Sequence, residues 1–351
     1  MKLTEETSEN LRALAFLCAL FVVPIHCWSE AKWFAGIENC TMFEAAVKLF
    51  LSCSFSRIAV PFFFVLTGFF LALNFKPTAI WYVQMLKKRA YTIYLPFVIW
   101  NALNVALCLV LGKEGYGEMG VARMSAKVFG WNLYESVGCR QFWYLQTVII
   151  WMFISPLVCW VLKRKILASL SLSFLAWGWA VNLLRYPQPL AVGNFLWLSI
   201  GTVAAFALCG NKTSSYAKYM QEGWMKACIA IMFGAAVAGR VAAGLYRHAG
   251  LYNVFDKCMI PIGLAMVFVN ASAIARSLAR LRSLWGLSFF IYAFHSVMIS
   301  VATLGATKFG AASGIEYPLK MTIAFIGTIA IGSLIRKRAS RIFAVIAGGR
   351  R

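Results

Sequence analysis

The sequence predicts an all-α fold, a polytopic membrane bundle of about ten transmembrane helices with both termini in the cytoplasm. Hydrophobic residues make up 61% of the 351 residues, and the mean hydropathy is +0.73. The apolar residues gather in runs that are long enough to cross a bilayer as helices. Lys and Arg lie mainly in the short segments between these runs. We therefore expect one integral membrane domain over residues 1–351.

The distribution of charge predicts the orientation in the membrane. The net charge is +22, from 34 Lys and Arg against 12 Asp and Glu. If the N-terminus is cytoplasmic, the inner segments hold 21 Lys and Arg and the outer segments 13, as the positive-inside rule favours. Because the basic residues are scattered through short loops, the charge indicates membrane topology and argues against nucleic-acid binding.

Ten apolar runs are the expected spans, and the loops between them are short except for 29–57 and 112–141. The expected spans are 11–28, 58–74, 91–111, 142–162, 166–184, 190–209, 225–246, 259–275, 284–305 and 317–335.

The first span carries two ionisable residues on one face. Arg12 and His26 lie about 21 Å apart along a helix axis and within roughly 40° of the same direction. We expect Arg12 near the cytoplasmic surface and His26 in the outer half of the membrane. Polar groups at such depth usually face a bundle interior or a wet cavity, which makes His26 a candidate catalytic residue. The alternative is a histidine that only hydrogen-bonds a neighbouring helix.

Arg57 opens the second span from the outside, in the stretch S-R-I-A-V-P-F-F-F-V-L-T-G. We expect it at a depth similar to that of His26, where an arginine could hold an anionic group or a developing oxyanion. The alternative is an interfacial side chain that reaches water. Thr67 and Gly68 are small and predict close helix packing.

Polar residues also stand near the ends of two further spans. The K-K-R stretch at 87–89 is expected on the cytoplasmic side, either as a positive-inside anchor or as a clamp for phosphate. The fourth span starts outside with R-Q-F-W-Y-L-Q-T, so Trp143, Tyr144 and Gln146 are expected near the outer surface.

The ninth span holds a second histidine inside an apolar run. His295 is expected near mid-membrane, and Tyr292 lies one turn earlier on the same face. A structural hydrogen bond and a functional role are both open for this imidazole.

The chemistry that these residues permit is narrow. The sequence has no Walker motif, H-E-x-x-H, G-x-S-x-G or acid-rich metal cluster, so no metal is expected. Every acidic residue falls outside the expected spans, which weakens a proton-relay interpretation. An imidazole and several arginines remain. Histidine can take a proton from a hydroxyl, which suits acyl transfer to an alcohol, and arginine can bind phosphate or stabilise an oxyanion.

With these residues in view, the chain resembles the acyltransferase family 3 proteins, integral membrane enzymes that decorate lipopolysaccharide, exopolysaccharide, peptidoglycan or small glycosides. The resemblance rests on five stretches in the family's order and covers nearly the whole chain. They are L-R-A-L-A-F…V-V-P-I-H, R-I-A-V-P-F-F-F-V-L-T-G, K-K-R-A-Y-T-I-Y-L-P, F-W-Y-L-Q…S-P-L and F-F-I-Y-A-F-H.

The resemblance implies an O-acyltransferase that moves an acyl group, expected to be acetyl, from cytoplasmic acyl-CoA to a hydroxyl of an extracytoplasmic glycan or glycolipid. The implied membrane is the bacterial cytoplasmic membrane, and homo-oligomerisation is left open. The site residues are assigned as follows: His26 as general base and Arg57 at the acyl group or oxyanion; Arg12, Lys88 and Arg89 at the donor phosphates; Trp143, Tyr144, Gln146, Tyr292 and His295 at the acceptor and the cavity.

One departure from the family pattern concerns the first helix. The family places ten residues between its arginine and its histidine, whereas thirteen separate Arg12 from His26. The expected arginine position is Ala15, so Arg12 would reach roughly 4–5 Å less deep.

A competing function is a membrane carrier or exporter of a polysaccharide or small metabolite, with His26 and Arg57 as binding residues. It predicts substrate movement without acylation and without dependence on acyl-CoA. A membrane anchor or recruiting subunit is a third class, which the two histidines inside apolar runs disfavour.

Overall fold

The computed structural model describes residues 3–37, 40–110, 119–134, 137–184, 186–209, 222–308 and 313–349. Within this part of the chain every regular element is helical, which confirms the all-α prediction. The chain divides into two compact units. Unit 1 comprises Met1, 64–211 and 334–351, and unit 2 comprises 2–63 and 212–333.

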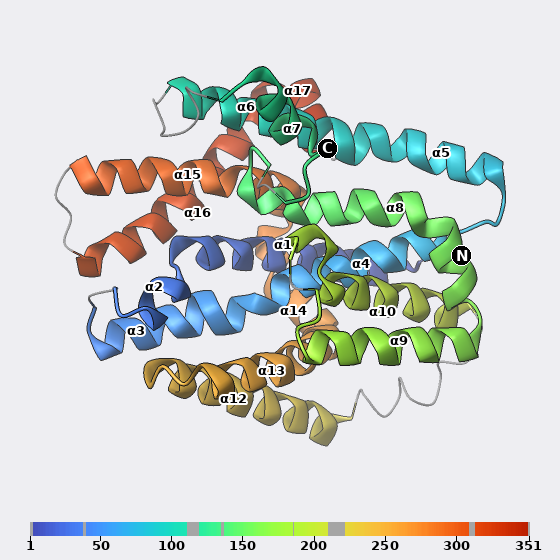
Figure 1. Cartoon of the computed structure of the whole chain (residues 1–351), viewed down its shortest axis with the longest axis horizontal. Helices are drawn as coiled ribbons and strands as arrows, with labels where there is room; N and C mark the ends of the chain where they lie inside the picture. Colours follow the sequence, from blue (N-terminus) through green and yellow to red (C-terminus); the bar gives the residue numbers. More distant parts are fainter. Residues whose placement is uncertain are drawn as a thin grey trace. The chain divides into compact units, whose positions relative to one another are not determined.

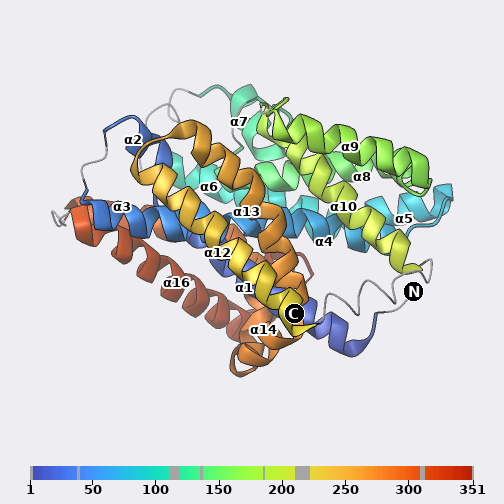
Figure 2. The same cartoon turned by 90° about the horizontal axis from the view of Figure 1, so that it is seen from below.

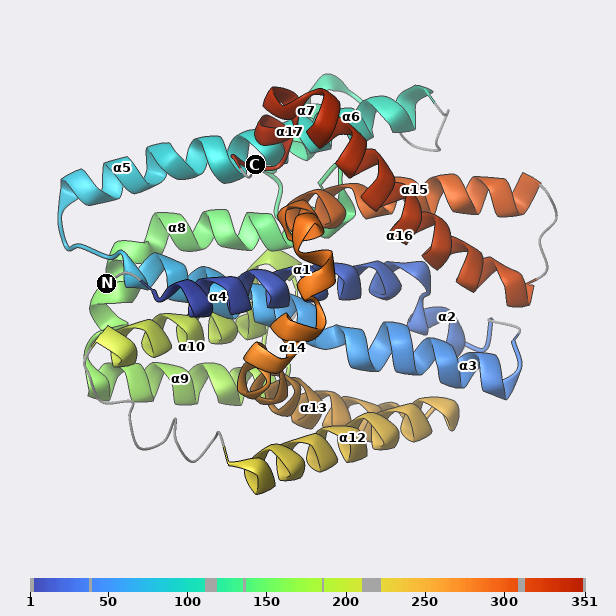
Figure 3. The same cartoon turned by 180° about the vertical axis from the view of Figure 1, so that it is seen from behind.

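Unit 2 contains the first and the last long helices of the chain. Its α12 and α13 lie side by side as a hairpin (Figure 2), and α14 crosses α1 (Figure 3). Its elements are α1 (Glu5–Cys27), α2 (Glu30–Phe34), α3 (Met42–Lys48), η1 (Leu49–Ser54), η2 (Phe55–Ile58), the start of α4 (Ala59–Leu73), α12 (Gly223–Leu245), α13 (Ala249–Val269), α14 (Ala271–Ser277), η6 (Ala279–Leu287), α15 (Ser288–Lys308) and most of α16 (Ser313–Arg338).

Unit 1 is built from the middle of the chain and its C-terminal end. Its α9 and α10 pack against each other and against α8 (Figure 1). Its elements are the rest of α4, α5 (Ala79–Arg89), η3 (Ala90–Tyr94), α6 (Leu95–Val110), α7 (Val121–Phe129), η4 (Arg140–Phe142), α8 (Trp143–Leu162), α9 (Lys165–Ala180), η5 (Gln188–Leu190), α10 (Val192–Cys209), the end of α16 and α17 (Ser340–Ile346).

The apolar helices agree with an integral membrane protein. Among the described residues, 9 helical runs are long and apolar enough to cross a membrane, and Lys165–Ala180 is a shorter apolar helix. Each of these ten elements overlaps one of the ten expected spans, and the number of membrane crossings stays a prediction. The cytoplasmic location of both termini stays a prediction.

One expected span begins ten residues too late. Hydropathy indicated a start at 259, but α13 begins at Ala249, so that Asp256 lies inside a membrane-length helix. The prediction that every acidic residue falls outside the spans is therefore wrong. Asp256 and Lys257 lower the local hydropathy without ending the helix, because a charge that finds a partner inside the bundle is compatible with it.

The K-K-R stretch also lies elsewhere than expected. Ala79–Val110 is one continuous helical run, so 87–89 is inside a helix and not in a loop. Arg89 lies ten positions after Ala79, which is about 15 Å of helix. Within unit 1, α5 contacts α8, and the Tyr82 hydroxyl donates to the Phe153 carbonyl at 2.9 Å. Arg89 and Gln146 line one cavity of this unit, and the side of the membrane on which each lies stays a prediction.

Two long helical runs are interrupted by wider turns. The π-helical segments η1 and η3 stand within Met42–Leu73 and Ala79–Val110. The 3₁₀ turn η2, which carries Arg57, follows η1, and η3 follows Arg89 directly. Such segments are frequent at functional sites, because a change of pitch re-aims the side chains beside it.

Glycines permit a close crossing of α4 and α10 in unit 1. A Cβ at Gly68 would collide with the Leu198 carbonyl, and one at Gly201 with the Val65 carbonyl. Backbone contact of this kind needs small residues, which confirms the prediction of close packing at Gly68.

We expect Gly201→Ala to lower the free energy of unfolding by about 1–3 kcal/mol, because the added methyl group must push the two backbones apart. Gly234→Ala in α12 is the matched control, since a Cβ there meets nothing within 4 Å. Thermal unfolding of both variants in detergent measures the difference. Equal stability of the two variants would show that the crossing is looser than the structure has it.

Candidate active site

A cavity of about 570 Å³ lies in unit 2, at the C-terminal end of α1. Its lining combines ionisable side chains from α1, α2, α3, η2 and α16. Four are cationic and two are carboxylates: Lys32, Lys48, Arg57 and Lys320 against Glu30 and Glu316. The surplus of cations suits a polar ligand that carries negative charge.

His26 projects from the last turn of α1 into this cavity. The apolar face of α1, with Phe16 and Val23, is buried in the unit, whereas the His26 side chain is exposed to the cavity. Trp28, with extended backbone, caps the helix. The imidazole is therefore placed by a well-buried helix and can meet a ligand.

Arg57 reaches the same cavity from η2. Its side chain is 36% exposed, and its Nε lies 3.6 Å from Oδ1 of Asp256. The structure thus brings together His26 and Arg57, the two residues that the sequence assigned to catalysis. Their chemical roles stay predictions.

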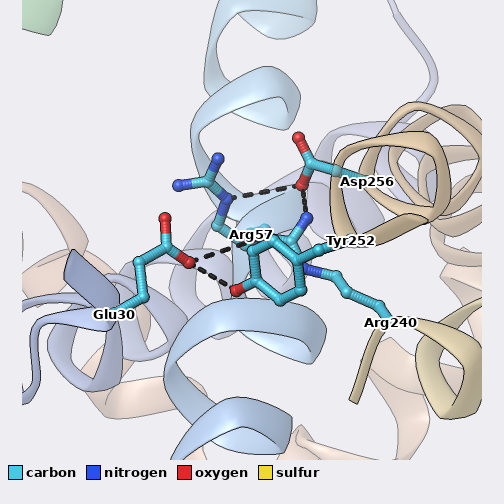
Figure 4. Close-up of polar contacts among 5 residues, drawn as sticks. All are labelled: Glu30, Arg57, Arg240, Tyr252 and Asp256. Atoms are coloured by element: carbon cyan, nitrogen blue, oxygen red, sulfur yellow. Dashed lines mark hydrogen bonds and ion pairs between the residues drawn. The ribbon is translucent and has the colours of Figure 1, made fainter. Parts of the chain in front are cut away.

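Behind Arg57 lies a network of charges around one buried arginine (Figure 4). Arg240 of α12, with a side chain only 1% exposed, pairs with Asp256 and lies 3.6 Å from Oε2 of Glu30. The Tyr252 hydroxyl donates to Glu30, and the Arg240 guanidinium stacks 4.1 Å from the centroid of the Tyr252 ring. Two arginines and two carboxylates thus balance each other, which makes the burial of Arg240 tolerable.

The α12–α13 hairpin positions this network. Tyr252 and Asp256 are four residues apart on α13 and so share one face, which α12 covers with Arg240. Glu30 closes the network from α2, immediately after α1. The network therefore connects the hairpin to the elements that present His26 and Arg57.

A second set of polar contacts also lines the cavity. The hydroxyls of Ser52 and Tyr317 are hydrogen-bonded at 2.7 Å, and Lys320 pairs with Glu316 one turn away on α16. Lys48 is buried, and its Nζ lies 5.9 Å from the centroid of the Trp28 ring.

His295 lies behind His26 and outside the described lining of the cavity. Its side chain is 0% exposed, and its ring centroid is 5.1 Å from that of His26. Tyr292 is buried, with its ring 6.5 Å from His295. Neither residue is among the described lining residues of this cavity, because both are buried in the packing of α15, and their role at the acceptor stays a prediction.

Unit 1 contains a separate cavity of about 620 Å³ with a mainly apolar lining. Lys87, Arg89 and Gln146 are its polar residues other than Tyr94, and Gln146 donates to the Gly130 carbonyl at 3.2 Å. Trp143 and Tyr144 pack against Phe64, and the Tyr144 hydroxyl is hydrogen-bonded to Thr67 at 2.9 Å. Arg89, Tyr144 and Gln146 thus belong to unit 1.

Two of the predicted donor-binding cations stand apart from both cavities. Arg12 is exposed on α1 and is not among the described lining residues of the His26 cavity. Lys88 is exposed on α5, and the described lining of the unit 1 cavity includes its neighbours but not Lys88 itself.

Comparison with known families decides the class of protein. The family model described as an acyltransferase domain, of family 3, matches residues 9–337. The chain belongs to acyltransferase family 3. The match includes both units and every helix that contributes to the two cavities. Nothing matches among curated proteins or among solved structures. This family 3 acyltransferase is therefore a transferase with membrane-length helices.

Sequence reasoning missed Glu30, Arg240, Tyr252 and Asp256. Arg240 had a usable signal, because it stands inside the expected span 225–246, and an ionisable residue at membrane depth marks a functional site by default. Asp256 had a weaker one: it lies three residues before an apolar run, and its partner is 16 positions away in the sequence.

Proposed function

We propose that this family 3 acyltransferase transfers an acetyl group from acyl-CoA to a hydroxyl of an extracytoplasmic glycan, with His26 as the general base. The observation that carries the proposal is the cavity of unit 2, where His26 and Arg57 face the same space among a surplus of cations. The family supports acyl transfer. The donor, the acceptor and the catalytic histidine are the proposed parts.

His26 supports the first step of this reaction. Its imidazole takes the proton of the acceptor hydroxyl while the hydroxyl oxygen attacks the thioester carbonyl, forming a C–O bond and an oxyanion. The oxyanion then collapses, the C–S bond breaks, and the proton passes from the imidazolium to the departing thiolate. The products are an O-acyl glycan and free CoA, and the base is restored.

Arg57 supports the oxyanion. A guanidinium has five N–H donors in a planar fork, and the Nε side of Arg57 is turned to Asp256 (Figure 4). Because Arg240 also binds Asp256, the carboxylate is fixed before the substrate arrives. Donors that are held in place in advance stabilise developing charge without reorganisation, and one such donor is worth about 10²–10³-fold in rate.

The test follows the labelled acyl group. Purified protein in proteoliposomes receives acetyl-CoA labelled in the acetyl group, together with membrane glycans. We expect base-labile label in the glycan and an equal amount of free CoA. Movement of unlabelled glycan across the vesicle membrane without acylation would instead favour the carrier.

The unit 1 cavity supports binding of the donor. It combines apolar surface with the cations Lys87 and Arg89, which is the chemistry of a phosphate attached to an extended organic chain. We propose that Arg89 contacts donor phosphate and that Lys88, exposed and outside the lining, contributes less.

We expect Arg89→Ala to raise the KM for acetyl-CoA about tenfold with little change in kcat, because the charge binds ground state and transition state alike. Lys88→Ala is the matched control, since it removes a neighbouring charge from outside the cavity lining. Steady-state release of CoA at varied donor concentration measures both constants. Equal KM values for the two variants would remove Arg89 from donor binding.

A further inference from the structure

Behind the proposed base lies a buried imidazole with an unused acceptor. His295 sits on α15, which packs along α1, and its side chain is 0% exposed. Its Nδ1 is 3.1 Å from the Ile291 carbonyl one turn earlier on the same helix. A carbonyl oxygen only accepts, so Nδ1 carries the proton and donates it.

The protonation state of the other ring nitrogen, Nε2, follows from the surroundings of the ring. The described residues include no ion-pair partner for His295, and an unpaired charge in so buried a place is disfavoured. The ring is therefore neutral, and its Nε2 is a bare acceptor. Nε2 is buried and has no hydrogen-bond partner among the described residues.

The ring of His26 is a polar group close enough to His295 to serve as the donor to its Nε2. The two ring centroids are 5.1 Å apart and the planes are tilted by 39°. Two imidazoles joined edge to edge by an N–H···N hydrogen bond have centroids roughly 5 Å apart, given a nitrogen–nitrogen distance of about 2.9 Å. Hydrogen bonds of catalytic groups often tighten only when the substrate is bound.

We propose that His295 is a positioning residue: its Nε2 accepts the N–H of His26 and holds that imidazole in the one tautomer whose unprotonated nitrogen faces the cavity. The inference rests on the proposed function for its catalytic meaning. In a hydrolytic triad a carboxylate orients the histidine in this way. Here a neutral imidazole, itself fixed by the Ile291 carbonyl, takes that place.

Solid-state NMR of the protein labelled with ¹⁵N-histidine in bilayers tests the hydrogen bond directly. The chain has only 3 histidines, and His248, which is exposed and accepts from the Leu251 N–H, is assigned with His248→Gln. We expect a through-space correlation between ring nitrogens of His26 and His295, and a single neutral tautomer of His26. Absence of that correlation, or two equally populated tautomers of His26, would overturn the proposal.

Two substitutions separate positioning from mere packing. His295→Phe keeps a ring without an acceptor, so we expect His26 to show both tautomers and kcat to fall about tenfold or more at unchanged KM. His295→Gln can place an amide oxygen near the position of Nε2 and should restore a single tautomer and most of kcat. An unchanged His26 spectrum in His295→Phe would contradict the proposal.

The NMR spectrum and the transfer rate distinguish failure of the proposed reaction from failure of the proposed hydrogen bond. If the wild-type protein transfers no acyl group while the His26–His295 correlation is present, the proposed reaction fails and the hydrogen bond stands. If transfer depends on His26 but His295→Phe changes neither spectrum nor kcat, the reaction stands and His295 is only packing.

Discussion

Replacing His26 with alanine is expected to lower acyl transfer by about 10²–10⁴-fold, the usual contribution of a general base. Stability should fall by only about 1–3 kcal/mol, because the side chain is exposed to the cavity and its loss leaves one buried acceptor, Nε2 of His295, without a donor. The rate of CoA release in proteoliposomes gives the effect, and the unfolding transition in detergent shows that the variant is folded.

Added imidazole sharpens this prediction. The cavity of about 570 Å³ leaves room beside residue 26, so free imidazole should restore part of the rate in His26→Ala. The restored rate should increase with the concentration of unprotonated imidazole. His248→Ala is the matched control, since His248 is exposed at the start of α13. Full activity of His26→Ala would exclude the histidine as base.

Removal of the buried guanidinium is expected to have the largest effect on stability. Arg240→Leu leaves Asp256 and Glu30 without the cation that both contact. Breaking a buried ion pair from one side typically costs about 3–5 kcal/mol, because the remaining charge is uncompensated. Unfolding of the purified variant in mixed detergent micelles measures the loss.

The double variant Arg240→Leu/Asp256→Leu distinguishes lost pairing from lost packing. With both charges of the pair gone, we expect the double variant to be more stable than Arg240→Leu alone. Arg276→Leu in α14 is the matched control, because that arginine is exposed, and should change stability by less than about 1 kcal/mol. A double variant that is no more stable than Arg240→Leu alone would contradict this pairing.

Most of the fold could be predicted because it depends on local composition. Apolar runs long enough to cross a bilayer are a property of consecutive residues, and each of the expected runs overlaps a described helix. Their ends could not be predicted as well. Asp256 in α13 and the cations at 87–89 in Ala79–Val110 are polar residues inside helices, which hydropathy reads as boundaries. The turn types of η1 and η3 leave no signal in residue type.

The candidate site could be predicted only in part, since it depends on contacts between distant segments. His26 and Arg57 were found because each is an ionisable residue in an apolar run. The pairing of Arg240 with Asp256 and Glu30 joins three segments, and nothing in one sequence states that they meet. For the same reason His295 was expected in the cavity, whereas the packing of α15 on α1 places it behind His26.

The most direct measurement is the initial rate of CoA release from acetyl-CoA by wild-type protein, His26→Ala and His248→Ala, in proteoliposomes with and without glycan acceptor. We expect release that requires the acceptor, is unchanged in His248→Ala and is lost in His26→Ala, with one acetyl group on the glycan for each CoA. Acceptor-dependent release at the wild-type rate in His26→Ala would contradict the assignment of the base. No release from any of the three proteins would contradict acyl-CoA as the donor.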